Sequence, residues 1–201
     1  RNYDFSKTNA MLVFTEANEG RHATISTVDL QFLGIDVDQD MTGLMDKVIC
    51  LAAPYAPLDG INDAGVSCGI YMTYQGAETV ATNQQTDKPD ITSTTMLRMI
   101  LDYASTVDEA IELVEQYDLH DSANTSYHYM VADAQGNSAI LEWVAGTDQT
   151  DNDGSARQLN VIRNDPQQNY QCVTNFVLTP GYYEERDEMG GKDRYDLLTS
   201  T

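Results

Sequence analysis

The chain has 201 residues, of which 41% are hydrophobic and 21% are charged, a composition typical of a globular protein rather than a disordered one. Its 32 acidic and 11 basic residues give a formal net charge of −21, which argues against nucleic acid and anionic membrane surfaces as partners. The longest apolar candidate for a membrane helix, residues 48–58, is interrupted by two prolines and falls short of the ~20 residues that a span requires.

The first part of the chain predicts strands separated by turns. β-Branched residues with partial alternation predict strands at residues 11–15 and 23–33. A short helix is expected within 41–52, before the first of the two prolines. The glycine-containing stretch DGINDAG at 59–65 predicts a turn, and 66–74 then predicts another strand.

Two adjacent helices and a hairpin are expected next. Residues 93–104 and 107–117 carry apolar side chains at helical spacing. Alternating residues at 127–132 and 138–144 flank the turn sequence AQGN, which predicts a β-hairpin.

The last part predicts two strands, at 158–162 and 171–174, and a helix at 193–198. The elements run from strands to two neighbouring helices and back to strands, without βαβ alternation. This order predicts an α+β fold with largely antiparallel sheets, in which the two helices cover one sheet. Because no linker or repeat divides the chain, we expect residues 1–201 to belong to a single domain.

The cysteines and histidines indicate neither a disulfide framework nor a metal site. Cys50, Cys68 and Cys172 are odd in number and form no CxxC pair, and the three histidines show no HExxH spacing. We therefore expect no metal and no cofactor. Local spacing also assembles no Ser/His/Asp or Cys/His set, and the sequence contains no GxSxG, GxGxxG or Walker motif.

Polar residues at the ends of predicted elements are more informative. Arg1 and Asp4 lie within the first five residues, Asn175 follows the predicted strand 171–174, and Arg194 lies at the start of the last helix. Taken one at a time, these residues are explained by a solvated strand end, a turn and a surface charge.

Five segments form a pattern that extends over nearly the whole chain. They are RNYDF at 1–5, DGINDAGVSCGI at 59–70, SYHYMVADAQGNSAILEW at 126–143, CVTN at 172–175 and KDRYDLL at 192–198. In this order they resemble the motifs of the choloylglycine hydrolase and penicillin V acylase family, linear amide C–N hydrolases of the N-terminal-nucleophile superfamily.

The resemblance implies an αββα sandwich, here partial, in which two stacked antiparallel sheets lie between helix layers. It also implies hydrolysis of linear, non-peptide C–N amide bonds, such as those of conjugated bile acids or penicillin V. In that mechanism an N-terminal cysteine attacks the amide, and its own α-amino group, with a pKa near ~8, acts as the base. The implied partner is a small-molecule N-acyl amide. The oligomeric state, a homo-oligomer included, and the compartment, cytoplasmic or secreted, are left open.

The resemblance assigns roles to the four polar residues. Asp4 would hold the α-amino group, and Arg1 would lie near the thiolate and favour its charged form. Asn175 would donate to the oxyanion through its side-chain amide, and Arg194 would complete the polar network. We expect the functional atoms of these four residues to meet in one cleft.

Two neighbouring positions, Tyr71 and Met72, are the expected oxyanion and substrate region. A backbone N–H near Met72 would be the second oxyanion donor. Bile salt hydrolases often carry Asn at this position and penicillin acylases carry Tyr, so Met72 weakens a bile-salt assignment. The change costs catalysis little if only the backbone amide acts.

The catalytic cysteine is the larger departure from the family pattern. The family places it upstream of the RN-x-D strand, and the sequence begins inside that motif. Cys50, Cys68 and Cys172 cannot replace it, because none has a free α-amino group, and Cys68 is expected to be buried in the sheet. We therefore expect the 201 residues to be an excerpt that does not hydrolyse amides by this mechanism on its own.

Two other functions remain open. A related N-terminal-nucleophile enzyme, either a dipeptidase or an acyltransferase-like amidase, shares the RN-x-D start, and substrate profiling separates it from the first interpretation. A non-catalytic acidic binding or scaffold domain would explain the missing nucleophile, and the residues upstream of Arg1 would distinguish it.

Overall fold

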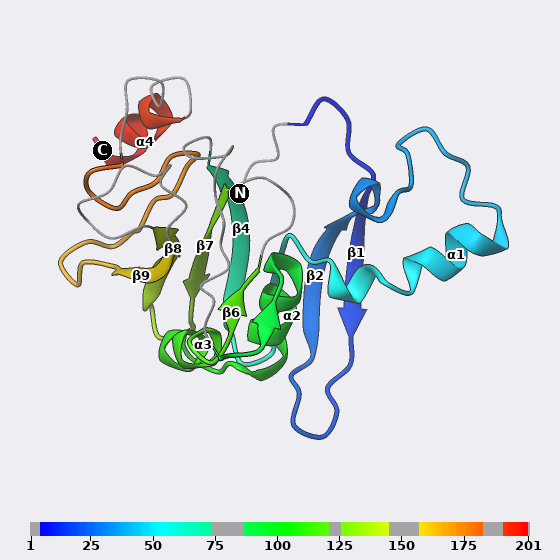
Figure 1. The fold of residues 1–201 in the computed structure, drawn as a ribbon, viewed down its shortest axis with the longest axis horizontal. Helices are drawn as coiled ribbons and strands as arrows, with labels where there is room; N and C mark the ends of the chain where they lie inside the picture. Colours follow the sequence, from blue (N-terminus) through cyan, green and yellow to red (C-terminus); the bar gives the residue numbers. More distant parts are fainter. Residues whose placement is uncertain (1–4, 74–86, 121–125, 145–156, 183–190, 201) are drawn as a thin grey trace.

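The centre of the fold is a seven-stranded antiparallel sheet with the strand order β1-β2-β3-β4-β7-β8-β9 (Figure 1). The structure is a computed structural model that describes residues 5–73, 87–120, 126–144, 157–182 and 191–200. Its sheet strands are β1 (Ala10–Thr15), β2 (Thr24–Asp29), β3 (Asp59–Asn62), β4 (Ser67–Thr73), β7 (Ser126–Ala132), β8 (Ser138–Val144) and β9 (Gln158–Arg163).

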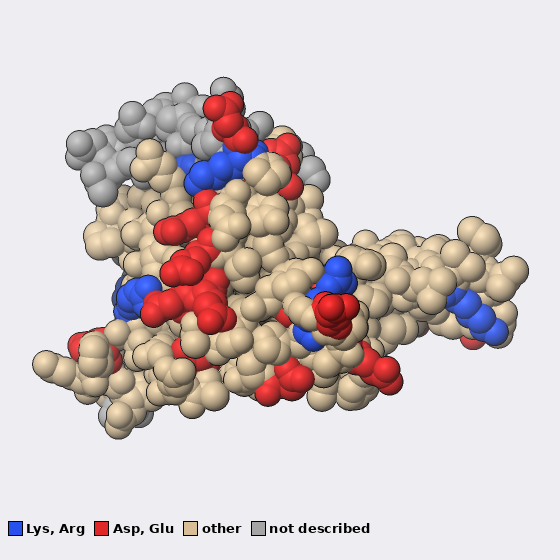
Figure 2. Space-filling model, turned by 90° about the horizontal axis from the view of Figure 1, so that it is seen from below, with Lys and Arg blue, Asp and Glu red and all other residues tan. Residues whose placement is uncertain are grey.

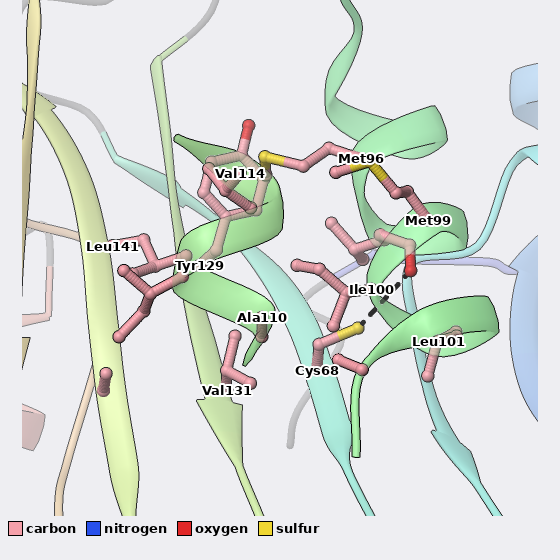
Figure 3. Close-up of a cluster of buried hydrophobic side chains, with 14 of the residues drawn as sticks. Cys68, Met96, Met99, Ile100, Leu101, Ala110, Val114, Tyr129, Val131 and Leu141 are labelled. Atoms are coloured by element: carbon pink, nitrogen blue, oxygen red, sulfur yellow. Dashed lines mark hydrogen bonds between the residues drawn. The ribbon is translucent and has the colours of Figure 1, made fainter. Parts of the chain in front are cut away.

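Two helices, α2 (Ser93–Tyr103) and α3 (Val107–Val114), pack on one face of this sheet through an apolar core (Figure 3). Neighbouring strand residues alternate between faces, so β4 and β7 direct every second side chain toward the helices. Burial of each large apolar side chain contributes about 1.5–3 kcal/mol, which makes this layer a large part of the folding free energy. Its buried members include Cys68, Ile70, Met96, Leu97, Ile100, Tyr129, Val131 and Leu141.

Shorter elements surround the sheet. The helix α4 lies at the end of the sheet away from α3, and α1 lies beyond the β1 edge (Figure 1). None of the helices in the described ranges is long and apolar enough to cross a membrane. These elements are η1 (Leu30–Leu33), α1 (Leu44–Cys50), η2 (Ala53–Tyr55), the parallel pair β5 (Asp90–Ile91) and β6 (Asp118–Leu119), and α4 (Lys192–Thr199).

The face of the sheet opposite the helices is apolar at its β1 side. Phe14, Ile25 and Ile61 are register partners on three adjacent strands, and all three are exposed, as is Leu12. The described residues thus form one large sheet with one helix layer, which is half of the predicted four-layer sandwich, and the small pair β5–β6. The predicted α+β class and the antiparallel sheet are confirmed.

Three predicted elements differ from the structure. The strand expected at 23–33 ends at Asp29, because the Asp29 carboxylate accepts the Gln31 N–H at 3.0 Å and starts the turn of η1. Residues 59–62, expected in a turn, form β3. The stretch 171–174, expected as a strand, forms none. The Thr174 carbonyl oxygen is bonded to the His128 side chain, and the Gln171 side chain donates to the Ile162 carbonyl oxygen in β9.

Candidate active site

Three predicted site residues from distant segments meet at one end of the sheet. Met72 lies near the end of β4, Asn175 lies in an irregular segment, and Arg194 lies in the first turn of α4. Asn175 Nδ2 donates to the Met72 carbonyl oxygen at 2.7 Å, and Arg194 Nη2 donates to Asn175 Oδ1 at 2.6 Å. Arg1 and Asp4 lie outside the described residues, so their place in this group stays a prediction.

The backbone before α4 comes very close to Asn175. Thr174 Oγ1 donates to the Gly191 carbonyl oxygen at 2.9 Å. Gly191 has φ +108°, and a Cβ there would lie 3.0 Å from Arg194 Nη2, 3.1 Å from Thr174 Cβ and 3.2 Å from Asn175 N. Only glycine gives both the backbone conformation and the space that this contact requires.

The two contacts of Asn175 orient its side chain as a hydrogen-bond donor. A guanidinium only donates, so Arg194 fixes the amide oxygen toward itself and turns the NH₂ group toward Met72. A cation on the oxygen also polarises the amide and strengthens its N–H donors. Met72 takes one of the two N–H bonds, and no described residue accepts the other. An N–H of this kind can stabilise a developing oxyanion.

Tyr71 is connected to the Asn175 segment through the side chain of His128. Its side chain lies on the opposite face of β4 from that of Met72, because strand neighbours alternate. The Tyr71 ring packs edge-on against His128, with 6.2 Å between the ring centroids. His128 in turn is bonded to the carbonyl oxygen of Thr174, the residue before Asn175.

A buried ionisable pair lies behind this segment, and sequence reasoning assigned it no role. His128 and Glu142 are directly opposite each other in β7 and β8, with 0% and 1% exposure and 2.9 Å between Nδ1 and Oε1. Glu142 also accepts from Leu178 N at 2.8 Å and from Thr179 N and Oγ1 at 2.9 and 2.6 Å. Burial acts to raise the pKa of Glu142, but the hydrogen bonds and charge interaction outweigh it, so the pKa lies below its ordinary value.

A second polar group joins side chains that local spacing did not bring together. His22 Nδ1 lies 2.8 Å from Asp63 Oδ1, and His22 Nε2 lies 3.2 Å from Ser105 Oγ. The atoms follow the order of a serine hydrolase triad. However, the Ser105 N–H donates to Glu109 Oε2 at 2.7 Å, and a carboxylate at this place would repel an oxyanion. We interpret this group as a hydrogen-bonded link between loops.

The cysteines of the chain do not join the Asn175 group. Cys68 is buried, as predicted, with its Sγ 3.8 Å from the Leu97 carbonyl oxygen. Cys50 and Cys172 are partly buried, and none of the three cysteines forms a disulfide. Within the described ranges, no group of three or more His, Cys, Asp or Glu side chains is placed to hold a metal ion.

Acidic side chains gather on the surface over α3. Figure 2 shows acidic side chains gathered on the side of the molecule seen from below. The exposed acidic residues of α3 and the position after it are Asp108, Glu109, Glu112 and Glu115. Arg163 pairs with Asp108 at 2.7 Å between Nη2 and Oδ1. A face with this charge repels the phosphate groups of nucleic acids and anionic lipids.

The chain is similar to known proteins in sequence and in fold. The family model of the linear amide C–N hydrolases, choloylglycine hydrolase family, matches residues 1–184. No curated protein matches the chain. Among solved structures, a variant of the conjugated bile acid hydrolase from Clostridium perfringens has a TM-score of 0.50 and 19% identity, over 81% of this chain and 44% of that one. The penicillin V acylase from Agrobacterium tumefaciens has a TM-score of 0.43 and 17% identity, over 77% and 39%.

The chain spans less than half the length of these solved enzymes. At 19% identity, the similarity to the bile acid hydrolase concerns the fold, and it supports the predicted hydrolase sandwich in partial form. The family match extends from the RNYDF motif past the CVTN motif that contains Asn175. The chain therefore belongs to the choloylglycine hydrolase family of linear amide C–N hydrolases.

Proposed function

We propose that the protein containing this chain hydrolyses linear, non-peptide C–N bonds of small N-acyl amides, with Asn175 as an oxyanion donor. The observation that carries the proposal is the contact of Asn175 with Met72 and Arg194. These residues come from three separate segments, and the family resemblance assigns each of them to the same site.

In the proposed reaction, the nucleophile is the thiol of an N-terminal cysteine that is none of Cys50, Cys68 and Cys172. The α-amino group takes the thiol proton, and the sulfur attacks the amide carbonyl carbon to give a tetrahedral oxyanion. The C–N bond then breaks as the amine leaves with a proton, and water hydrolyses the remaining thioester. Arg1 would favour the thiolate and Asp4 would hold the α-amino group.

The arrangement around Asn175 supports stabilisation of the tetrahedral intermediate. Its amide is fixed before any substrate binds, because Arg194 and Met72 hold its two polar ends. Donors that need no reorganisation stabilise the transition state more than the ground state. The positive charge of Arg194 adds to this effect through the amide dipole.

The substrate class is tested by release of free amine from a panel that contains glycine- and taurine-conjugated bile acids, penicillin V and simple dipeptides. We expect the full-length protein to turn over at least one N-acyl amide and no dipeptide. Because Met72 weakens a bile-salt assignment, penicillin V is an essential member of the panel. Turnover of dipeptides alone would support the dipeptidase, and no turnover at all would support the binding or scaffold domain.

A further inference from the structure

The segment that carries Asn175 has no regular structure of its own. Residues 171–182 form neither helix nor strand, so no ladder of backbone hydrogen bonds fixes their position. The place of the Asn175 amide depends instead on the side chains that bind this segment.

The buried His128–Glu142 pair binds the segment on both sides of Asn175. His128 Nε2 lies 2.6 Å from the Thr174 carbonyl oxygen, one residue before Asn175. The Glu142 carboxylate accepts the N–H groups of Leu178 and Thr179, which follow Asn175 after two intervening residues. Main-chain atoms on either side of Asn175 are thus tied to one pair of side chains.

The chemistry of the pair makes these ties strong. The Glu142 carboxylate and the Thr174 carbonyl oxygen, one at each ring nitrogen of His128, are both hydrogen-bond acceptors. Hydrogen bonds with a charged partner are shorter and stronger than neutral ones, and burial protects them from water. The two side chains also stand on paired inner strands of the sheet, whose backbone hydrogen bonds hold His128 and Glu142 opposite each other.

We propose that His128 and Glu142 are positioning residues that set the location of the Asn175 amide for catalysis. This inference rests on the proposed function, in which Asn175 stabilises the oxyanion. The pair acts through the backbone of residues 174–179, and it touches neither substrate nor nucleophile. A displacement of about 1 Å at a reacting centre can lower a rate on the order of 100-fold, so loss of the pair should reduce turnover through Asn175.

The test is a double-mutant cycle of Glu142→Gln and Asn175→Ala in the full-length protein. Glu142→Gln keeps the size of the side chain but removes its charge and one acceptor. We expect this change to lower kcat by about 10- to 100-fold and to change KM by less than about twofold. In the Asn175→Ala background, the same change should lower kcat by less than about twofold, because the positioned group is already gone.

Asp133→Asn is the matched control. Asp133 is a buried carboxylate in the same hairpin, and it accepts the N–H groups of Val107, Gln135 and Asn137, which lie outside the Asn175 segment. Loss of this carboxylate in Asp133→Asn should lower the stability of the protein and leave kcat within about twofold of the wild-type value. An equal loss of kcat in Asp133→Asn and Glu142→Gln would overturn the positioning role.

A second readout does not depend on turnover. The side-chain NH₂ signals of Asn175 in a ¹H–¹⁵N spectrum are identified by their loss in Asn175→Ala. They should shift in Glu142→Gln and stay in place in Asp133→Asn. Unchanged signals in Glu142→Gln would refute the positioning of Asn175, while an inactive wild type with shifted signals would refute the proposed function alone.

If Glu142→Gln does not fold, Thr179→Val tests the positioning role in its place. It removes one hydrogen bond to Glu142 at almost constant side-chain volume. We expect a severalfold loss of kcat that disappears in the Asn175→Ala background. A loss of the same size in both backgrounds would contradict the proposal.

Discussion

Asn175 and Met72 are 103 residues apart in the sequence, and a 2.7 Å hydrogen bond joins the side-chain amide of the first to the carbonyl oxygen of the second. The contact attaches an irregular segment to the end of a sheet strand. Arg194 binds the other end of the same amide, so the donor is held from two elements at once. Changes to either of these two contacts should lower turnover more than they lower the stability of the fold.

Arg194→Met should lower kcat by about 10-fold or more, because a hydrogen bond to a charged group contributes about 1.5–3 kcal/mol. The apolar side chain keeps the length of the stem and loses the donor. The matched control is Arg163→Met, which removes an exposed ion pair with Asp108 of α3, at the opposite end of the strands from Met72, and should leave kcat unchanged. Steady-state kinetics on the same amide compares the two, and equal effects would contradict a role for Arg194.

Gly191→Ala should damage both stability and turnover. Its φ of +108° costs a side-chain-bearing residue about 1–2 kcal/mol, and the added Cβ would also press on Thr174 and Asn175. Gly181→Ala is a control for the conformation alone, since Gly181 has φ +94° and nothing within 4 Å of the new Cβ.

Thermal unfolding and kcat separate these two effects of the glycines. Both alanine variants should lose stability, but only Gly191→Ala should lose kcat. A loss of kcat in Gly181→Ala of the same size would show that crowding at Gly191 has no part in the site.

Asn62→Ala should lower the free energy of unfolding by about 2–3 kcal/mol without a specific loss of kcat. Asn62 is buried, donates to the carbonyl oxygens of Leu101 and Ala104 at 3.1 and 2.7 Å, and accepts the Val66 N–H at 2.9 Å. It thus joins the β3–β4 turn to the end of α2. Urea unfolding measures the loss, and Asn169→Ala, at an exposed bend, should show almost none.

Stability should fall on acidification partly through Glu142. Its pKa in the folded protein lies below the ordinary value of 4.5, so its contribution is fully present above about pH 4.5 and is lost as the pH falls through the folded value. The difference in unfolding free energy between wild type and Glu142→Gln should therefore shrink as the pH is lowered from 7 to 3. A difference that stays constant or grows over this range would show that the carboxylate charge is not what stabilises the segment.

Periodic segments of the fold were predictable from the sequence. The apolar spacing of 93–104 and the alternation around AQGN correspond to α2 and to the β7–β8 hairpin. Local side-chain bonds were not predictable, and they decide the exceptions. Asp29 ends β2 by capping the next turn. In residues 171–174, Thr174 bonds to the His128 side chain and the Gln171 side chain bonds to the β9 backbone, and no strand ladder forms.

The site residues could be predicted from the family motifs, but not from the local spacing of residue types in the sequence. Asn175, Met72 and Arg194 were named from the resemblance, whereas their contact depends on how three distant segments pack. The His128–Glu142 pair did leave a signal in the sequence. The hairpin register around AQGN places both ionisable residues opposite each other between apolar neighbours, where a charge needs a partner.

The most direct test of the account is kcat of Asn175→Ala beside Asn169→Ala, measured in the full-length protein on an N-acyl amide that the wild type hydrolyses. Loss of an oxyanion donor should lower kcat by about 100- to 1,000-fold with little change in KM, while the exposed control keeps wild-type turnover. Wild-type kcat in Asn175→Ala would show that this amide does not stabilise the transition state.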